Sequence, residues 1–232
     1  LRRRQRQMCI RDRFNTYEYL VQLYKSNVED HRRRGKIYSE KQLRELIYKK
    51  AACFFKVMYS LGFGLNEKLC EHIGRALQIV DDVLDMEHDL SVGQINITRE
   101  EIEKFGIDIS SPTLLTDLEK KGFYDYRAEQ VLQHIKRARD IAQEIEDKWT
   151  RKFSLMATEI IAAPILENRF RPGEKYYVKG GRLLDSLLPK DEKKAYRRGH
   201  KLIKMLCRFF PQCNRKLLEK KLEELPDEEP RL

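Results

Sequence analysis

Three aspartates recur at intervals of four residues in a segment with strong helical character. Asp81, Asp85 and Asp89 occupy positions i, i+4 and i+8. At about 100° per residue, these positions fall within an arc of roughly 80° on a helix. Three like charges on one face repel each other unless a cation lies between them. Mg²⁺ prefers oxygen ligands and commonly shares its shell with substrate phosphates, so the spacing predicts Mg²⁺-dependent chemistry on a phosphorylated compound.

The aspartates border the apolar face of this helix rather than lie opposite to it. On a helical wheel the acidic row also contains Gly74 and Gln78, and it runs beside an apolar stripe that includes Leu77. A helix on a protein surface usually carries its charges opposite the apolar face, whereas a helix that lines a cavity can bring acids to the edge of that face. A solvated acidic flank is the alternative interpretation.

The composition is that of a chain that can bury one core. Its 232 residues are 41% hydrophobic and 9% aromatic, and we expect a single domain. No apolar run approaches the roughly 20 residues that a membrane span requires. The five cysteines form no CxxC pair, so neither a zinc site nor a disulfide framework is predicted. A reduced, cytoplasmic setting is the simplest interpretation.

The net charge of +10 is unevenly distributed. Residues 1–13 contain six Arg and one Asp, and therefore carry half of that charge. Within them, Met8 to Arg13 reads like a translated sequencing adaptor, so we expect 1–13 to be a non-native or disordered leader and the native part to begin near Phe14. The rest of the chain is only mildly basic, and no nucleic-acid motif stands out, so no nucleic-acid partner is expected.

Helical patterns extend over almost the whole chain, and the fold class is predicted to be all-α. The longer helices are expected at residues 15–26, 40–61, 66–90, 126–151 and 154–170. Ser39 is a predicted N-cap, Thr98 to Glu101 has the spacing of a capping box, and Pro164 is expected to kink its helix. We expect one domain over 14–225 and a disordered tail at 226–232.

The segment around the aspartates resembles a known family motif. It reads Gly74-x-Ala76-x-Gln78-x-x-Asp81-x-x-x-Asp85-x-x-x-Asp89-x-x-x-Gly93-x-Ile95, and a capped helix ending in Phe105-Gly106-Ile107 follows it. This run is similar, without gaps, to the second aspartate-rich region of squalene and phytoene synthases. Asp85 and Asp89 match the acids of that family's DxxxD motif. Upstream, Tyr48 with Ala51 and Ala52 resembles a weakened form of the family's Tyr-x-Val-Ala-Gly segment.

The resemblance implies a class I isoprenoid synthase fold, which is an all-helical bundle around a central cavity. In this superfamily, Mg²⁺ held between two acidic helices binds an allylic isoprenoid diphosphate, withdraws charge from the leaving pyrophosphate and promotes an allylic carbocation. The activity implied is prenyl transfer between such diphosphates. The implied catalytic metal ligands are Asp81, Asp85 and Asp89. The implied substrate-binding residues are Tyr48, Gly74, Leu77 and Gln78.

A sister family is a second reading of the same residues. The run from Ala76 to Asp85 is also very like the second aspartate-rich motif of head-to-tail polyprenyl diphosphate synthases. The residues after Asp89 favour the squalene and phytoene branch, because Gly93 to Gly106 follows its layout.

The chain departs from the family pattern in several places. Leu84 and Gln94 stand where phytoene synthases tend to have Arg, and Asn96 replaces a common Tyr. The first aspartate-rich motif is missing, since Asp30 is the only Asp between residue 14 and residue 80. The resemblance therefore implies a chain that is truncated at its N-terminus and inactive by itself.

A third reading is a non-enzymatic basic helical module that binds nucleic acid or a membrane surface. It would use the Arg-rich residues 2–6, the run His31 to Arg34 in an expected polar connector at 27–36, and the basic C-terminal helices around Lys193 to Lys201. Those C-terminal helices are also compatible with peripheral membrane contact by an enzyme with apolar products. The module would bind independently of Mg²⁺ and lose affinity with salt.

Overall fold

The computed structural model describes residues 2–45, 49–62, 66–173 and 215–225. Every regular element within these ranges is helical and none is a strand, which confirms the predicted all-α class. The expected disordered tail at 226–232, the predicted substrate-binding residue Tyr48 and the basic segment 193–201 lie outside the described residues.

Helix α1, Arg2–Arg32, is longer than expected. The sequence predicted a leader, a helix at 15–26 and a polar connector that started at residue 27. In the structure the helix continues through residue 32, and the connector is confined to 33–39. Residues 2–13 of the expected leader form the first part of α1, and the expectation that they are non-native or disordered stays a prediction.

Ser39 caps helix α2, Glu40–Leu43, as predicted. Its hydroxyl accepts the backbone N–H of Gln42 at 3.3 Å, and the Gln42 side chain accepts the backbone N–H of Ser39 at 2.9 Å, which completes a capping box. The helix expected over 40–61 is described in two parts, α2 and α3, Lys49–Gly62, and residues 46–48 between them lie outside the described residues.

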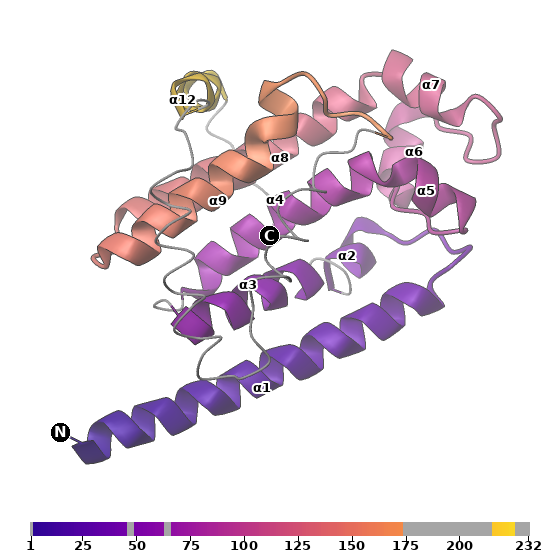
Figure 1. Cartoon of the computed structure of the whole chain (residues 1–232). Coiled ribbons are helices and arrows are strands. Elements are labelled where there is room, and N and C mark those ends of the chain that lie inside the picture. The colour runs from indigo at the N-terminus through magenta and orange to yellow at the C-terminus, as the bar shows by residue number, and fades with distance from the viewer. Residues whose placement is uncertain (1, 46–48, 63–65, 174–214, 226–232) are drawn as a thin grey trace.

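Helix α4, Glu67–Leu84, is the central element of the fold. Its N-cap is Asn66, whose side chain accepts the backbone N–H of Leu69 at 3.0 Å. Helix α4 packs against α3 on one side and against α8 on the other, and α1 lies along the far side of α3 (Figure 1). Because it is covered from both sides, α4 is buried over most of its circumference.

Gly74 allows α3 and α4 to cross in close contact. A Cβ atom at this position would lie 2.4 Å from the backbone nitrogen of Ala52 and 2.7 Å from the carbonyl carbon of Ala51. No side chain fits there without moving the two helix backbones apart. Gly74 was expected to leave room beside the acidic row for substrate, but the space next to it is occupied by α3.

We expect Gly74→Ala to destabilise the protein by about 1–3 kcal/mol, because overpacking outweighs the better helix propensity of Ala. Urea unfolding followed by circular dichroism measures the change. Lys68→Ala on the exposed side of α4 is the matched control and should change the free energy of unfolding by less than about 0.5 kcal/mol. Equal stability of Gly74→Ala and the wild type would contradict the close crossing.

The helix that carries the aspartates is interrupted at Asp85. The sequence predicted one helix over 66–90, but α4 ends at Leu84 and α5, Met86–Ser91, follows. In a continuous helix the Leu84 carbonyl would accept the N–H of His88. It instead accepts the backbone N–H of Gly173 at 3.0 Å. A hydrogen bond from a distant part of the chain therefore replaces the one that would continue the helix.

Helix α6, Arg99–Phe105, begins and ends as predicted. The Thr98 hydroxyl accepts the N–H of Glu101 at 3.1 Å, and the Glu101 carboxylate accepts the N–H of Thr98 at 2.9 Å. Gly106 ends the helix with a φ of 56°, in the left-handed region that glycine adopts readily. The capping box expected from Thr98 to Glu101 is confirmed.

The C-terminal half of the described chain starts with α7, Leu114–Lys120, and α8, Phe123–Gln143. Helix α9, Lys148–Leu166, follows an N-cap at Asp147 and contains Pro164. These bounds replace the expected helices at 126–151 and 154–170. The last described helix is α12, Arg215–Glu223, which contacts α8 and α9.

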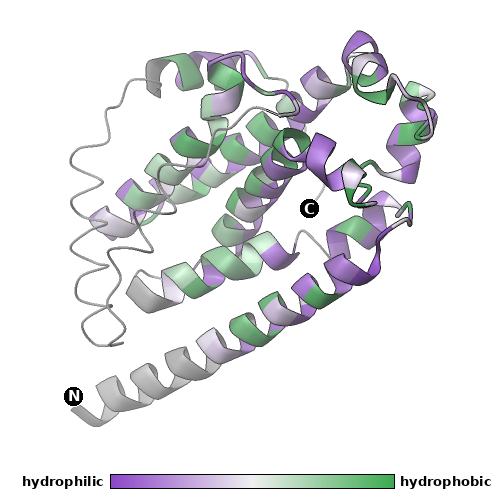
Figure 2. Cartoon of the chain, turned by 45° about the vertical axis from the view of Figure 1, so that its right-hand side comes forward, coloured by the Kyte–Doolittle hydropathy of each residue, from purple (hydrophilic) through white to green (hydrophobic). Residues whose placement is uncertain are grey.

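The helices form successive layers, with α1 on one outer side, then α3, α4, and the pair α8 and α9 (Figure 1). The apolar core lies between α3, α4, α8 and α9. The C-terminal part of α1 is largely hydrophilic (Figure 2). Among the described helices, none combines the length and apolar character needed to cross a bilayer.

Two histidines meet in the interface between α4 and α8. The Nδ1 atoms of His72 and His134 lie 3.1 Å apart, and both side chains are buried. One ring must donate and the other accept, so a second proton cannot be accommodated between them. Burial lowers the pKa of His134 well below its ordinary value, and the charge of Arg75 lowers it further.

Acid should therefore weaken the α4–α8 interface. His134 stays neutral in the folded state, whereas the unfolded chain takes up a proton below a pH of about 6.5, so its contribution to stability is complete above that pH and is lost on acidification. We expect His134→Gln to remove about 1–2 kcal/mol of the fall in unfolding free energy between pH 7 and pH 5. Urea titrations of both proteins at these two pH values measure it, and identical falls would contradict the prediction.

Candidate functional site

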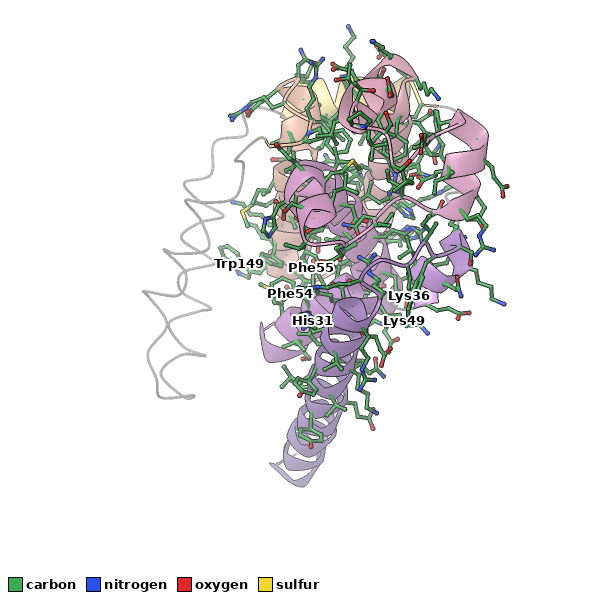
Figure 3. All side chains as sticks on the ribbon, turned by 90° about the vertical axis from the view of Figure 1, so that its right-hand side faces the viewer. His31, Lys36, Lys49, Phe54, Phe55 and Trp149 are labelled. Carbon is green, nitrogen blue, oxygen red and sulfur yellow. The ribbon has the colours of Figure 1, made fainter. Side chains whose placement is uncertain are left out.

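The predicted acidic row lies at the end of the molecule where α1 ends and α3 begins. In Figure 3 this end faces the viewer, and the labels of His31 and Lys36 mark the end of α1 and the following connector, while Lys49 marks the start of α3. The C-terminal part of α4, helix α5 and the loop 92–98 also reach this end.

The three aspartates stay in register across the break between α4 and α5. The N–H of Asp85 donates to the carbonyl of Asp81 at 2.9 Å, and the N–H of Asp89 donates to the carbonyl of Asp85 at 2.8 Å. Successive acids are thus still one turn apart. Asp81 and Asp89 are half-buried and Asp85 is exposed, so the middle acid of the row is the most accessible to solvent.

The aspartates of the row interact electrostatically. Burial raises the pKa of Asp81 to about 7, and the charges of Asp82 and Asp85 add to this effect. Burial and the charge of Asp85 likewise raise the pKa of Asp89. Ionising the whole row therefore costs free energy, and a cation bound among the carboxylates would recover it.

We expect Asp81→Asn to stabilise the metal-free protein at pH 8 by about 1–3 kcal/mol, after allowance for partial exposure. The pKa of Asp81 is raised in the folded state, so the stability that its protonated form provides is lost as the pH rises from about 3.8 through about 7. Asn cannot ionise and escapes this loss. Urea unfolding in EDTA at pH 8 and pH 5 should show the larger gain at pH 8, and the exposed Asp125→Asn is the control. A destabilised Asp81→Asn protein at pH 8 would contradict the electrostatic account.

Asp82 is a further acid next to the row that the sequence analysis did not single out. It is 3% exposed and accepts a hydrogen bond from Nε2 of Gln78 at 2.9 Å. Burial raises the pKa of Asp82 to about 6, while the charges of Arg127 and Arg33 oppose the rise. Gln78, expected to contact substrate, thus donates to this carboxylate.

Asp30 brings an acid from a second helix to the same end. Its carboxylate accepts hydrogen bonds from Nε of Arg33 at 2.7 Å, Nζ of Lys50 at 3.1 Å and Nε2 of Gln94 at 2.8 Å. Burial would raise the pKa of Asp30, but its bond to Arg33 and the charges of Arg33 and Lys50 lower it below its ordinary value. The charge of Lys50 also lowers the pKa of Asp81, so Lys50 acts on both acids.

Arg33 connects the end of α1 to the loop that follows α5. The sequence placed it in an exposed basic run, yet Arg33 is 1% exposed. Besides Asp30, it donates to the carbonyl of Ile95 at 2.7 Å and to the side-chain oxygen of Asn96. The side-chain nitrogen of Asn96 in turn donates to Asp89 at 2.5 Å.

Arg127 of α8 holds the same loop from the opposite side. Its Nη2 donates to the carbonyl of Asn96 at 2.9 Å and to the Glu101 carboxylate at 2.6 Å. The side chains of this ion pair are 2% and 7% exposed. Because Glu101 also belongs to the capping box of α6, Arg127 ties the loop to the start of that helix.

Leu77 and its apolar neighbours on α4 belong to the core. Val80 and Leu84 are fully or almost fully buried, and Leu77, the implied substrate-binding residue, is partly buried against the same core cluster. In the part of the chain that the structure describes, no group of three or more His, Cys, Asp or Glu side chains is arranged to hold a metal ion. The Mg²⁺ site therefore stays a prediction.

Some of the residues that sequence reasoning missed carry a recognisable signal. Arg127 lies between Phe123 and Val131 within the apolar stripe of α8, and a charge in such a stripe indicates a buried partner. Asp82 similarly interrupts the buried face of α4. Arg33 offers no such signal, because its neighbours Arg32 and Arg34 are exposed.

The chain matches no protein-family model, no curated protein and no solved structure.

Proposed function

We propose that the chain belongs to an Mg²⁺-dependent prenyltransferase of the class I isoprenoid synthase type, similar to squalene and phytoene synthases, which condenses allylic isoprenoid diphosphates. The observation that carries the proposal is the row of Asp81, Asp85 and Asp89, which stay one turn apart across a helix break. Asp30 of a second helix is close enough to Asp89 to raise the pKa of that carboxyl. The family is proposed from the motif between Gly74 and Ile95, which resembles the second aspartate-rich region of squalene and phytoene synthases. The all-helical fold is compatible with that family.

The donor set suits Mg²⁺ rather than a softer metal. All candidate ligands in the row are carboxylates, and Mg²⁺ is usually bound by one or two carboxylates together with water and substrate phosphate oxygens. A row without a complete protein cage is compatible with that mode. When bound, Mg²⁺ would neutralise charge on the leaving pyrophosphate.

The chain's own residues would then divide the remaining tasks. Asp81, Asp85 and Asp89 would hold the metal, and Lys50 would contribute a positive charge next to Asp30 and Asp81. Gln78 would act indirectly, because it donates to Asp82. The resemblance further implies an apolar cavity that would exclude water from the reacting chain.

The test is equilibrium binding of farnesyl thiodiphosphate, a poorly reactive analogue, to the chain with and without Mg²⁺. We expect binding that requires Mg²⁺ and survives 0.3 M NaCl. Binding that ignores Mg²⁺ and collapses with salt would instead support the basic-module reading. Arg33 does not support the basic-module reading, because its guanidinium is buried. It donates hydrogen bonds to Asp30, Ile95 and Asn96.

A further inference from the structure

A chain of hydrogen bonds leads from the end of α1 to the last aspartate of the row. Nη2 of Arg33 donates to the side-chain oxygen of Asn96, and Nδ2 of Asn96 donates to Oδ2 of Asp89 at 2.5 Å. Arg33 and Asn96 are 1% and 4% exposed. The bond between Arg33 and Asn96 is therefore shielded from competing water, and the bond between Asn96 and Asp89 is partly buried.

The donors and acceptors in the hydrogen bonds from Arg33 through Asn96 to Asp89 can be assigned in one way only. A guanidinium group has donors and no acceptor, so the atom of Asn96 that faces Arg33 must be its oxygen. The amide nitrogen then faces Asp89 and donates to it. Asn96 thus holds Oδ2 of Asp89 by hydrogen bonding.

Further hydrogen bonds hold both Arg33 and Asn96 in place. Arg33 also donates to Asp30 at 2.7 Å and to the carbonyl of Ile95 at 2.7 Å. The backbone carbonyl of Asn96 accepts from Arg127 at 2.9 Å. Hydrogen bonds from Arg33 and Arg127 thus hold Asn96 by its side chain and its backbone.

The backbone joins the same two segments. The N–H of Gly35 donates to the carbonyl of Gly93 at 2.6 Å, and the N–H of Arg99 donates to the carbonyl of Tyr38 at 3.0 Å. Backbone hydrogen bonds therefore join the connector after α1 to the loop after α5. The side-chain bonds from Arg33 through Asn96 to Asp89 link the same two segments.

We propose that Arg33 and Asn96 are positioning residues that set the orientation of the Asp89 carboxylate for a divalent cation bound with a diphosphate group. This inference rests on the proposed function. Residues that orient a metal ligand by hydrogen bonding typically change metal affinity 10- to 100-fold when they are removed. A merely structural role would lower stability and leave metal affinity unchanged.

The experiment measures Mn²⁺ binding in the presence of inorganic pyrophosphate by electron paramagnetic resonance. Asn96→Leu keeps the side-chain size and removes both hydrogen bonds, and we expect it to weaken Mn²⁺ binding about 10- to 100-fold. Arg33→Lys keeps the charge but loses the planar group that contacts three partners, so we expect an intermediate loss. Circular dichroism verifies that each variant is folded.

Arg139→Met is the matched control for a buried arginine. Arg139 is 4% exposed and contacts Thr158 of α9 and Glu219 of α12, away from the aspartates. Its replacement should lower stability and leave Mn²⁺ binding within about twofold of the wild type. Wild-type affinity in folded Asn96→Leu and Arg33→Lys would overturn the positioning role alone. A wild-type protein that binds no Mn²⁺ with pyrophosphate would overturn the proposed function and this inference with it.

Discussion

Replacing the exposed or half-buried acids of the row should abolish Mg²⁺-dependent binding of a diphosphate. We expect Asp85→Ala and Asp89→Ala each to weaken binding of farnesyl thiodiphosphate by about 100-fold or more, which corresponds to about 2.7 kcal/mol of binding free energy. Asp85 is exposed and lies at the junction of α4 and α5, so its loss should cost little stability.

Isothermal titration calorimetry at a fixed Mg²⁺ concentration measures these affinities. The matched control is Asp125→Ala, which removes an exposed acid from α8 outside the row. It should bind the diphosphate as the wild type does. If Asp85→Ala, Asp89→Ala and Asp125→Ala all bind equally well, the row is a solvated acidic flank and does not hold the metal.

Breaking the buried ion pair between α6 and α8 should give the largest loss of stability. Arg127→Met would leave the Glu101 carboxylate buried without its cation, because the Arg127 and Glu101 side chains are 2% and 7% exposed. Removing one partner of a buried pair costs about 3–5 kcal/mol. Urea unfolding followed by circular dichroism measures the loss.

A second variant and an exposed pair make this test specific. Glu101→Gln added to Arg127→Met removes the unpaired charge and should recover more than about 1 kcal/mol. Arg171 and Glu119 form an ion pair at the surface. Their charged atoms lie 2.9 Å apart, and the two side chains are 64% and 50% exposed. Arg171→Met should therefore cost less than about 1 kcal/mol. Equal losses for Arg127→Met and Arg171→Met would contradict the account.

Local sequence signals were sufficient for much of the fold. Ser39 and Thr98 cap their helices as predicted, because a capping box depends on residues three apart. The all-α class followed from helical periodicity. The interruption at Asp85 could not be predicted, since neither Gly nor Pro lies nearby and the Leu84 carbonyl is taken by Gly173, which is distant in sequence.

The sequence predicted the acidic residues of the candidate site, but it did not predict the residues that form hydrogen bonds with them. The spacing of Asp81, Asp85 and Asp89 identified a row that the structure keeps one turn apart. The contribution of Asp30 depends on where α1 ends, and that helix extends beyond its predicted boundary. The role of Arg33 depends on long-range bonds to Ile95 and Asn96, which no local pattern encodes.

Gly74 has a packing role that the sequence motif did not predict. The residue belongs to the run that resembles squalene and phytoene synthases, and we expected it beside the substrate. In the structure it is the contact point of α3 and α4, where a Cβ would approach the Ala52 nitrogen to 2.4 Å. A glycine in such a motif can therefore serve the packing that places the acids rather than the site itself.

The most direct test of the metal site is a crystal structure of the protein with Mn²⁺ and pyrophosphate. Anomalous scattering locates Mn²⁺ without ambiguity. We expect Mn²⁺ within about 2.0–2.4 Å of carboxylate oxygens of the row Asp81, Asp85 and Asp89, with pyrophosphate oxygens completing its shell. Mn²⁺ and pyrophosphate bound elsewhere, with these three carboxylates exposed to solvent and without metal, would contradict the account.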